Sequence, residues 1–509
     1  MYEYRLMNDT SPRFELSVFI PAIFITGLIG LGFVFASDFM TSVTAKARAM
    51  VTTNWGWLYL LFGLFALIYC LWLSLGRFSD VKFGAPDEAP EFSTPHWVSM
   101  MFTAGIGAGL VTWAFGEPIY YIQSPPMGIE PLSDKAYEWA HMYPLIHWGL
   151  LPWAFYAVAA VPIAYGLFVL KQPYLRISEA CDAALPKRGK SRLKTIIDIF
   201  IILGIVAGTT TSLGIGVPLL SALVTELTGV EDNFVMKFLI LAVLVLIFGV
   251  SIFRGLKRGI QMLADINMAL AGLLLFILLF VGPTLFILNI SVNSLGLMLD
   301  NFFRIILWTD PVTGSTFPLD WTVFYWAWWW AFAAFVGLFV ARISRGRTIR
   351  QVVLGTILWG SLGTIGYLAI AGGYALHLQK TGVLDLTQIL AQDDLYGLTA
   401  KIAGHLPFGK LSLTFFLIVC LIFYATTMDS AAYIAASVCS KEIKLDQDPV
   451  LSLRIIWVGI LFLMTLGTVI SDSLDTVMSI TVIGSLPLLP IVMLMCVSLN
   501  RQLTQNVKT

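Results

Sequence analysis

The run from Trp321 to Val340 constrains the fold more than any other stretch, because its twenty residues carry no charge. A helix of about 20 apolar residues is long enough to cross the hydrocarbon core of a bilayer. Four arginines follow between Arg342 and Arg350. A cationic block directly after an apolar run is typical of the cytoplasmic end of a transmembrane helix. The stretch therefore predicts a membrane-spanning helix.

The composition indicates that the whole chain is an integral membrane protein. Hydrophobic residues make up 58% and charged residues 12%, whereas about 25% of a soluble domain is charged. The net charge is zero, so nothing indicates nucleic acid as a partner. The first fifteen residues lack the layout of a cleaved signal peptide. The five cysteines show no C-x-x-C spacing, so neither a disulfide framework nor a metal site is expected.

Apolar segments of about 20 residues recur along the chain and predict an all-α fold with about twelve transmembrane helices. They cover roughly residues 15–36, 55–76, 97–123, 140–170, 195–225, 234–253, 261–290, 320–341, 349–377, 411–439, 452–471 and 474–499. With both termini in the cytoplasm, most of the 31 lysines and arginines lie on inner loops. The loop 171–194 is the most basic, and we interpret it as a topology determinant. The segment after residue 291 is amphipathic and predicts a helix on the outer surface.

The tryptophan cluster within the opening run indicates a binding wall. Five tryptophans fall within ten residues and continue into phenylalanines at helical spacing. An interfacial belt is the other interpretation, but a belt would not continue two to three turns into the helix. A π-rich wall facing a cavity suits a quaternary ammonium ligand. Trp148, Trp153 and Tyr156 could form a second wall, or a belt.

The third segment contains three alternating glycines and one carboxylate, and each feature has two interpretations. Gly105, Gly107 and Gly109 alternate in mid-helix and favour unwinding at a site, where backbone N–H groups could bind a substrate carboxylate. Close helix packing through small residues is the alternative. Glu117 is an intramembrane carboxylate, which is a functional candidate by default. A structural hydrogen-bond partner is an equally good interpretation.

Hydroxyl-bearing residues stand at membrane depth in two other segments. One is the run from Thr209 to Ser212, and the other is the pair Thr426 and Thr427. Such oxygens suit interhelical hydrogen bonds or a hard cation such as sodium. Asp429 follows the pair. The chain has no phosphate-binding loop, so ATP-driven transport by the chain itself is unsupported.

These motifs together resemble the betaine/carnitine/choline transporter family over nearly the whole chain. The resemblance rests on WTVFYWAWWWAFAAFVGLFVARISRGRT from residue 321, FTAGIGAGL at 102–110, GEPIYY at 116–121, HWGLLPWAFYA at 147–157, GTTTSLGIG at 208–216, RGLKRGIQMLADINM at 254–268 and TTMDSA at 426–431. It implies a leucine-transporter-type core of two inverted five-helix repeats behind two leading helices. The implied division is 1–96 (tail and leading helices), 97–290 (first repeat), 291–319 (outer helix and loop), 320–500 (second repeat) and 501–509 (tail).

The resemblance also implies site residues. The aromatic box of the family corresponds to Trp148, Trp153, Tyr156 and Trp329, with Trp326, Trp328 and Tyr120 as neighbours and Phe332 where many members have tryptophan. The principal sodium site corresponds to Thr103, Ile106, Phe423, Thr426 and Thr427. A second sodium site would need two threonines one turn apart. Thr209 matches one, but Ile205 stands at the other.

The implied function is not enzymatic. It is import of a quaternary ammonium compound (glycine betaine, carnitine or choline) across the bacterial inner membrane by sodium symport. A sodium-independent substrate/product antiporter of the carnitine/butyrobetaine type is the first alternative. That branch carries an arginine where this chain has Gln261, which favours symport. A transport-like ligand-binding sensor is the second alternative. The resemblance further implies a homotrimer in membrane lipid, with sodium as coupling ion and no cofactor.

Overall fold

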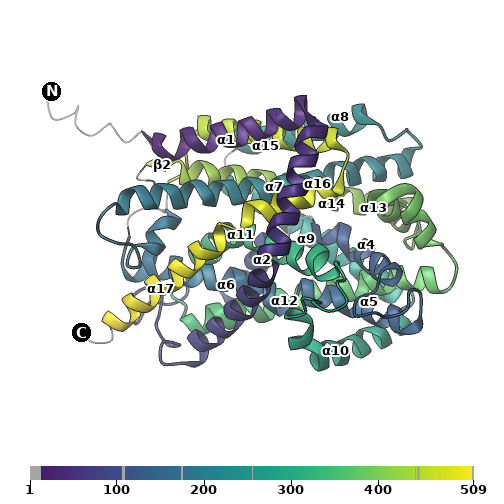
Figure 1. Cartoon of the computed structure of the whole chain (residues 1–509), viewed down its shortest axis with the longest axis horizontal. Coiled ribbons are helices and arrows are strands. Elements are labelled where there is room, and N and C mark those ends of the chain that lie inside the picture. The colour runs from purple at the N-terminus through teal and green to yellow at the C-terminus, as the bar shows by residue number, and fades with distance from the viewer. Residues whose placement is uncertain are drawn as a thin grey trace.

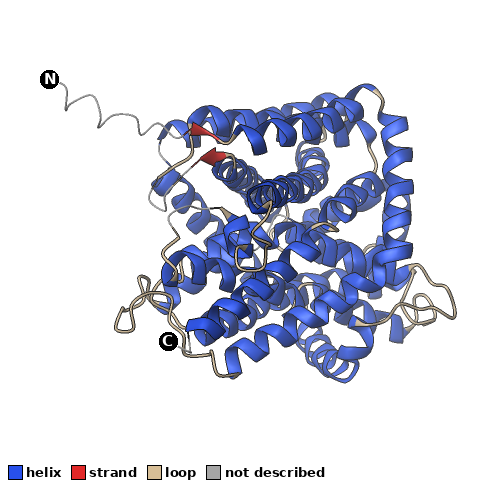
Figure 2. Ribbon diagram, turned by 60° about the vertical axis from the view of Figure 1, so that its left-hand side comes forward, coloured by secondary structure: helices blue, strands red, loops and turns tan. Residues whose placement is uncertain are grey.

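The computed structural model of the chain is helical almost throughout (Figure 2). The structure describes residues 13–105, 109–172, 176–254, 256–441, 443 and 447–506. Within these ranges, the side chains of residues 13, 102–105, 248, 250–254, 256–265 and 506 are not described. Thr103 therefore contributes only backbone to the account below, Ile106 and Gly107 lie outside it, and so does the side chain of Gln261.

The described elements follow one another in the order of the predicted segments. The helices up to the middle of the chain are α1 (Leu16–Phe35), α2 (Ser37–Leu75), α3 (Thr94–Gly105), α4 (Gly109–Gln123), α5 (Asp134–His147), α6 (Leu150–Ala164), α7 (Lys190–Thr228), α8 (Phe234–Arg254) and α9 (Leu256–Phe280). Those of the second half are α10 (Thr284–Ile306), α11 (Val323–Arg342), α12 (Ile349–Lys380), α13 (Leu386–Gly404), α14 (Lys410–Val438), α15 (Leu451–Ser471), α16 (Leu474–Ser485) and α17 (Leu488–Asn506). Two-residue strands, β1 (Arg13–Phe14) and β2 (Ser440–Lys441), pair antiparallel.

The helices confirm the prediction of an all-helical membrane protein. Ten of the described helices, some joined end to end, are long and apolar enough to cross a bilayer. Two shorter apolar helices, Phe234–Ile247 and Ile266–Phe280, lie in the sixth and seventh predicted segments. The described residues of the third predicted segment lie in α3 and α4. Each of the twelve predicted segments thus coincides with helix.

The predicted end of the seventh segment at residue 290 is wrong. Helix α9 ends at Phe280, and α10 begins at Thr284 after Gly282 and Pro283. Proline has no backbone N–H and a fixed φ, so it starts a helix more easily than it continues one. The apolar residues after Pro283 belong to the predicted amphipathic helix, which is seven residues longer at its start than expected. This helix packs against α5 and α12.

The centre of the molecule is formed by α6, α7 and α11. The buried share of residues in the most apolar 18-residue window is 94% for Asp134–Val169 (α5 and α6), 83% for Pro318–Arg342 and 78% for Lys190–Thr228. The corresponding share is 28% for α1 and 22% for α10. Figure 1 shows α1 beside α15 at one edge and α10 at the opposite edge. The aromatic-rich helix α11 is therefore surrounded by protein, and it packs most extensively on α6.

The arginine block after α11 joins the two halves of the chain. The guanidinium of Arg347 is buried, lies 4.4 Å from the ring centre of Trp97 and donates to the Phe92 carbonyl at 3.0 Å. Arg345 pairs with Glu88 at 2.6 Å. These contacts hold the loop before α3 against the start of α12.

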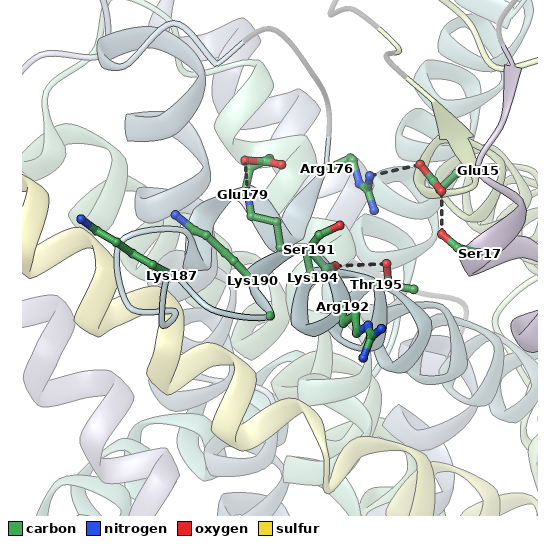
Figure 3. Close-up of a pocket in the computed structure, with 11 residues that line it drawn as sticks. Glu15, Ser17, Arg176, Glu179, Lys187, Lys190, Ser191, Arg192, Lys194 and Thr195 are labelled. Atoms are coloured by element: carbon green, nitrogen blue, oxygen red, sulfur yellow. Dashed lines mark hydrogen bonds and ion pairs between the residues drawn. The ribbon is translucent and has the colours of Figure 1, made fainter.

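The basic loop before α7 and the start of this helix form several ion pairs. They border an open pocket of about 700 Å³ (Figure 3). Lys194 lies 2.6 Å from both Glu179 and Asp182, and Lys190 lies 2.6 Å from Asp182. Although partial burial raises it, hydrogen bonds from the two lysines hold the pKa of Asp182 below its usual value. Lys190 and Lys194 thus serve the packing of this surface, whereas the role of the loop in topology stays a prediction.

Asp429 of α14 and Arg454 of α15 form a buried ion pair at 3.1 Å, with 3% and 5% of their side chains exposed. We expect Arg454→Leu to destabilise the protein by about 3–5 kcal/mol, because it removes one partner of a buried ion pair. Thermal unfolding in detergent measures this. Lys380→Leu is the matched control, since Lys380 forms an exposed ion pair with Asp134. An unfolding temperature lowered equally by both variants would contradict the expectation.

Candidate functional site

A small cavity of about 30 Å³ lies between α4, α6, α7 and α11. It has room for one or two water molecules in this conformation. Its lining residues are Gly109, Trp148, Tyr156, Ser212, Trp328, Trp329 and Phe332. Six of these seven were predicted substrate-binding residues, from segments that lie far apart in the sequence. The seventh, Ser212, was predicted only as part of a run of hydroxyls.

The rings around the cavity form the sides of an aromatic box. The Trp148 ring lies 5.5 Å from that of Trp329 at an interplanar angle of 74°. The Tyr156 ring lies 4.9 Å from Trp329 at 49°. Steeply inclined rings are a favourable packing for aromatic pairs, and they turn electron-rich faces in more than one direction. No charged side chain is among the lining residues, so a cation in the cavity would meet these ring faces directly.

The position of Trp148 follows from a break in the fourth predicted segment. Helix α5 ends at His147, Trp148 is its C-cap, and α6 begins at Leu150. Pro152 lies in the first turn of α6, where its missing N–H costs no helical hydrogen bond. The fourth predicted segment is thus divided into two helices, and the break brings the Trp148 side chain against α11.

Trp153 stands behind the box rather than on the cavity. Its ring is 5.6 Å from Tyr156 and 6.0 Å from Trp329. Its indole N–H donates to the hydroxyl of Thr364 in α12 at 3.2 Å, and this hydroxyl in turn donates to the Trp148 carbonyl at 2.5 Å. Trp153 therefore supports the two rings that line the cavity.

Glycines allow these rings to approach the neighbouring helices. A Cβ atom on Gly109 would lie 2.2 Å from Cη2 of Trp328, and one on Gly360 would lie 2.1 Å from the Trp153 ring. Both distances are far below contact distance. For Gly109, the first residue of α4, close packing is therefore established. Gly105 ends α3, and Gly107 lies outside the described residues, so unwinding of the glycine triplet stays a prediction.

Two other predicted residues lie away from the cavity. Trp326 is fully buried on another side of α11, with its ring 5.6 Å from that of Phe155. It is two residues from Trp328, which places the two rings about 200° apart around the helix. Tyr120 lies 5.1 Å from Trp321. It is eleven residues beyond Gly109 in α4, about 16 Å along the helix axis.

The spacing of Ser212 places it on the face of Gly208, and the structure shows where this face lies. It follows Gly208 by four residues, so both lie on one face of α7. A Cβ on Gly208 would lie 3.1 Å from the Phe332 ring, so this face meets α11 at the box. The Ser212 hydroxyl donates to the Gly208 carbonyl at 3.2 Å. Its oxygen lone pairs remain available toward the cavity.

The hydroxyls predicted to bind sodium are turned toward their own helix. Thr426 donates to the carbonyls of Ile422 and Phe423 at 2.9 and 3.0 Å, and Thr427 donates to that of Phe423 at 2.8 Å. A hydroxyl that donates to the backbone keeps its lone pairs for a cation. The Thr103 side chain and Ile106 lie outside the described residues, so the complete set of ligands stays a prediction.

The run of hydroxyls on α7 serves in part for helix packing. Thr211 donates to the Val477 carbonyl at 2.9 Å and hydrogen-bonds Thr481, both in α16. The hydroxyl oxygens of Thr209 and Thr210 are buried and have no partner among the described residues. Ile205, buried one turn before Thr209, offers no oxygen from its side chain. The second sodium site remains without one of its two implied hydroxyls.

Glu117 accepts hydrogen bonds from four side chains. One carboxylate oxygen lies 2.7 Å from the Tyr121 hydroxyl and 2.7 Å from Nδ1 of His147. The other lies 2.9 Å from the Tyr325 hydroxyl and 3.1 Å from Nε1 of Trp148. The interpretation as a structural hydrogen-bond partner therefore holds, and it joins α4, α5 and α11.

Comparison with known proteins points to one family. A family model described as BCCT, betaine/carnitine/choline family transporter, matches residues 17–508. The chain is 32% identical over 494 residues to the glycine betaine transporter OpuD of Bacillus subtilis, covering 96% of this chain and 94% of the relative. It is 31% identical to a carnitine transporter of Acinetobacter baumannii, with 88% and 81% covered. It is 33% identical to the uncharacterized transporter YeaV of Escherichia coli, with 87% and 92% covered.

The packing of Trp328 on Gly109 leads to a prediction. We expect Gly109→Ala to displace the Trp328 ring and to shift the tryptophan emission of the protein, because the added methyl group overlaps the indole. Fluorescence spectroscopy of the purified protein measures the shift. Gly272→Ala is the matched control, since no atom lies within 4 Å of a Cβ at this helical position. An unchanged emission spectrum for Gly109→Ala would show that the ring does not depend on this contact.

Proposed function

Because the chain belongs to the betaine/carnitine/choline transporter family, we propose that it imports a quaternary ammonium compound of the glycine betaine, carnitine or choline type by sodium symport. The family consists of transporters and not of enzymes. The observation that carries the proposal is the aromatic box around the cavity. We further propose the bacterial inner membrane as its location, with both termini in the cytoplasm and a homotrimer as the assembly.

The chemistry of the box suits a trimethylammonium group. Such a group carries a positive charge but has no hydrogen-bond donor. It therefore cannot form a hydrogen bond to water or to a carboxylate, and an aromatic face can bind it through its charge. A cation over an aromatic face gains about 2 kcal/mol or more when the contact is desolvated. The rings of Trp148, Tyr156 and Trp329 are almost completely buried, so a cation between them would make contacts of this desolvated kind. A cavity of about 30 Å³ is too small for a trimethylammonium group, so we propose that the rings separate when substrate enters.

The far end of the substrate would meet polar groups at the edge of the box. The Ser212 hydroxyl can turn to donate to a carboxylate or a hydroxyl of the ligand. Backbone N–H groups between Gly105 and Gly109 are further candidates. These groups would discriminate among betaine, carnitine and choline, since the methylated ammonium is common to all three.

Sodium coupling is supported by the paired hydroxyls on α14. Thr426 and Thr427 present oxygen lone pairs, and hard cations prefer oxygen ligands. Coupling requires that sodium and substrate each raise the affinity for the other. The antiporter branch has an arginine where this chain has the neutral Gln261, which favours symport. We therefore propose one sodium site that includes these two hydroxyls.

The proposal predicts sodium-dependent uptake. Labelled glycine betaine, carnitine and choline are offered to proteoliposomes with and without an inward sodium gradient. We expect accumulation of at least one of them, falling at least tenfold without sodium. Uptake that ignores sodium but requires internal substrate would identify an antiporter, and it would remove the assigned role of Thr426 and Thr427.

The box predicts a large effect of Trp329→Leu. Leucine fills part of the space but has no π face, so we expect at least a tenfold rise in the KM for uptake and in the Kd from ligand-induced tryptophan quenching. Trp359→Leu is the matched control, because this tryptophan of α12 is 49% exposed at the surface. Unchanged affinity in Trp329→Leu would contradict the assignment of this wall.

A further inference from the structure

The carboxylate of Glu117 directly contacts a ring of the box, at the indole N–H of Trp148. It is completely buried, and burying a carboxylate is costly unless its oxygens are hydrogen-bonded. The four donors described above satisfy both oxygens. Because all of them belong to the protein, little acceptor capacity is left for a substrate. A direct contact between Glu117 and the ligand is therefore disfavoured, and its effect on the box must pass through the donors.

Trp148 is the donor that lines the cavity. Its indole N–H donates to Glu117 at 3.1 Å, and its backbone carbonyl accepts from Thr364 at 2.5 Å. These two bonds fix a residue that lies between the ends of α5 and α6. The indole N–H of Trp328, which lines the same cavity, has no partner among the described residues. Trp148 is thus oriented by a hydrogen bond, whereas Trp328 is held by packing on Gly109.

Tyr325 ties the same carboxylate oxygen to α11. Its hydroxyl lies 2.9 Å from Glu117, and its ring is 5.6 Å from Trp148 at an interplanar angle of 65°. On the other face, Tyr325 stacks on His147 at 4.6 Å. One oxygen therefore sets the position of Trp148 relative to α11, which carries the opposite wall of the box.

We propose that Glu117 is a positioning residue for substrate binding, which holds the Trp148 indole at the angle that the ammonium group requires. This inference rests on the proposed function of the box. A cation–π contact depends on the placement of the cation over the ring face, so a Trp148 ring free to rotate would bind the ammonium group more weakly. The reach of the acceptor to Trp148, more than its charge, is what the site requires, because the indole N–H is held only by an acceptor within hydrogen-bond distance.

Two substitutions at Glu117 distinguish the length of the side chain from its charge. Glu117→Gln keeps the length, and its amide oxygen can accept from Trp148 and Tyr325. Its NH₂ group can donate to Tyr121 and to His147, whose ring can change tautomer. Glu117→Asp keeps the charge but withdraws the carboxylate by about 1.5 Å, which places Trp148 beyond hydrogen-bond distance.

The test measures the Kd from ligand-induced tryptophan quenching, and KM and kcat for uptake, using the substrate that the wild-type protein transports. We expect Glu117→Gln to stay within about threefold of wild type in Kd. We expect Glu117→Asp to raise Kd and KM at least tenfold, with a smaller change in kcat. Equal or tighter binding by Glu117→Asp than by Glu117→Gln would overturn the proposal.

A double-mutant cycle tests whether Glu117 acts through Trp148. Trp148→Phe keeps an aromatic face but removes the N–H donor. We expect the loss caused by Glu117→Asp to shrink to less than threefold in the Trp148→Phe background, since coupled residues are non-additive. Independent, multiplicative losses would overturn the proposal. If Glu117→Asp does not fold, Trp148→Phe is compared with Trp328→Phe, and an equal or smaller loss for Trp148→Phe overturns it.

A buried histidine of α5, the helix that ends next to Trp148, serves as the control for a general loss of stability. His141 of α5 lies 2.7 Å from the Ser294 hydroxyl and 2.9 Å from the Ala369 carbonyl, away from the box. We expect His141→Ala to lower the unfolding temperature and to leave Kd unchanged, and a rise in Kd equal to that of Glu117→Asp would contradict positioning. If Trp329→Leu loses binding but Glu117→Asp does not, the positioning inference alone fails. If the wild-type protein binds none of the three compounds, the proposed function fails.

Discussion

The packing of α11 against α6 is the contact on which the rest of the site depends. These two helices bring Trp329 against Trp148 and Tyr156, from segments nearly two hundred residues apart. The two helices approach closely at Gly337 of α11, where an added Cβ atom would lie 2.8 Å from the Ala159 side chain of α6. Aromatic side chains bury a large area at a small cost in conformational entropy. The same rings therefore stabilise the centre of the fold and provide its binding surface.

Buried polar groups then determine how this apolar centre is oriented. Glu117 collects donors from α4, α5 and α11, and Thr364 of α12 ties Trp153 to the Trp148 backbone. Asp429 and Arg454 join α14 to α15 in the same way. A buried polar group without a partner costs several kcal/mol, so each of these contacts excludes helix arrangements that apolar packing alone would tolerate. Polar contacts thus give an otherwise uniform apolar bundle a defined geometry.

The split between α5 and α6 shows how local sequence serves the site. A continuous helix would carry Trp148 and Trp153 at a fixed angle to each other. The break at Trp148–Gly149 lets Trp148 face the cavity while Trp153 lies behind it. A similar division of tasks is found on α11, where Trp326 packs toward α2 and α6 while Trp328 and Trp329 line the cavity. Tryptophans of one cluster therefore have different roles.

The sequence alone determined that the chain is helical, spans a membrane many times and belongs to its family, because apolar run length and local motifs carry that information. It also named most of the rings around the cavity. It did not decide the end of α9, since Gly282 and Pro283 interrupt a run that stays apolar. Only the tertiary structure placed Trp326 and Tyr120 away from the cavity, brought Ser212 to its wall and gave Glu117 its four partners. Periodicity tells which residues share a helix face, but the direction of that face depends on the neighbouring helices, and these are distant in sequence.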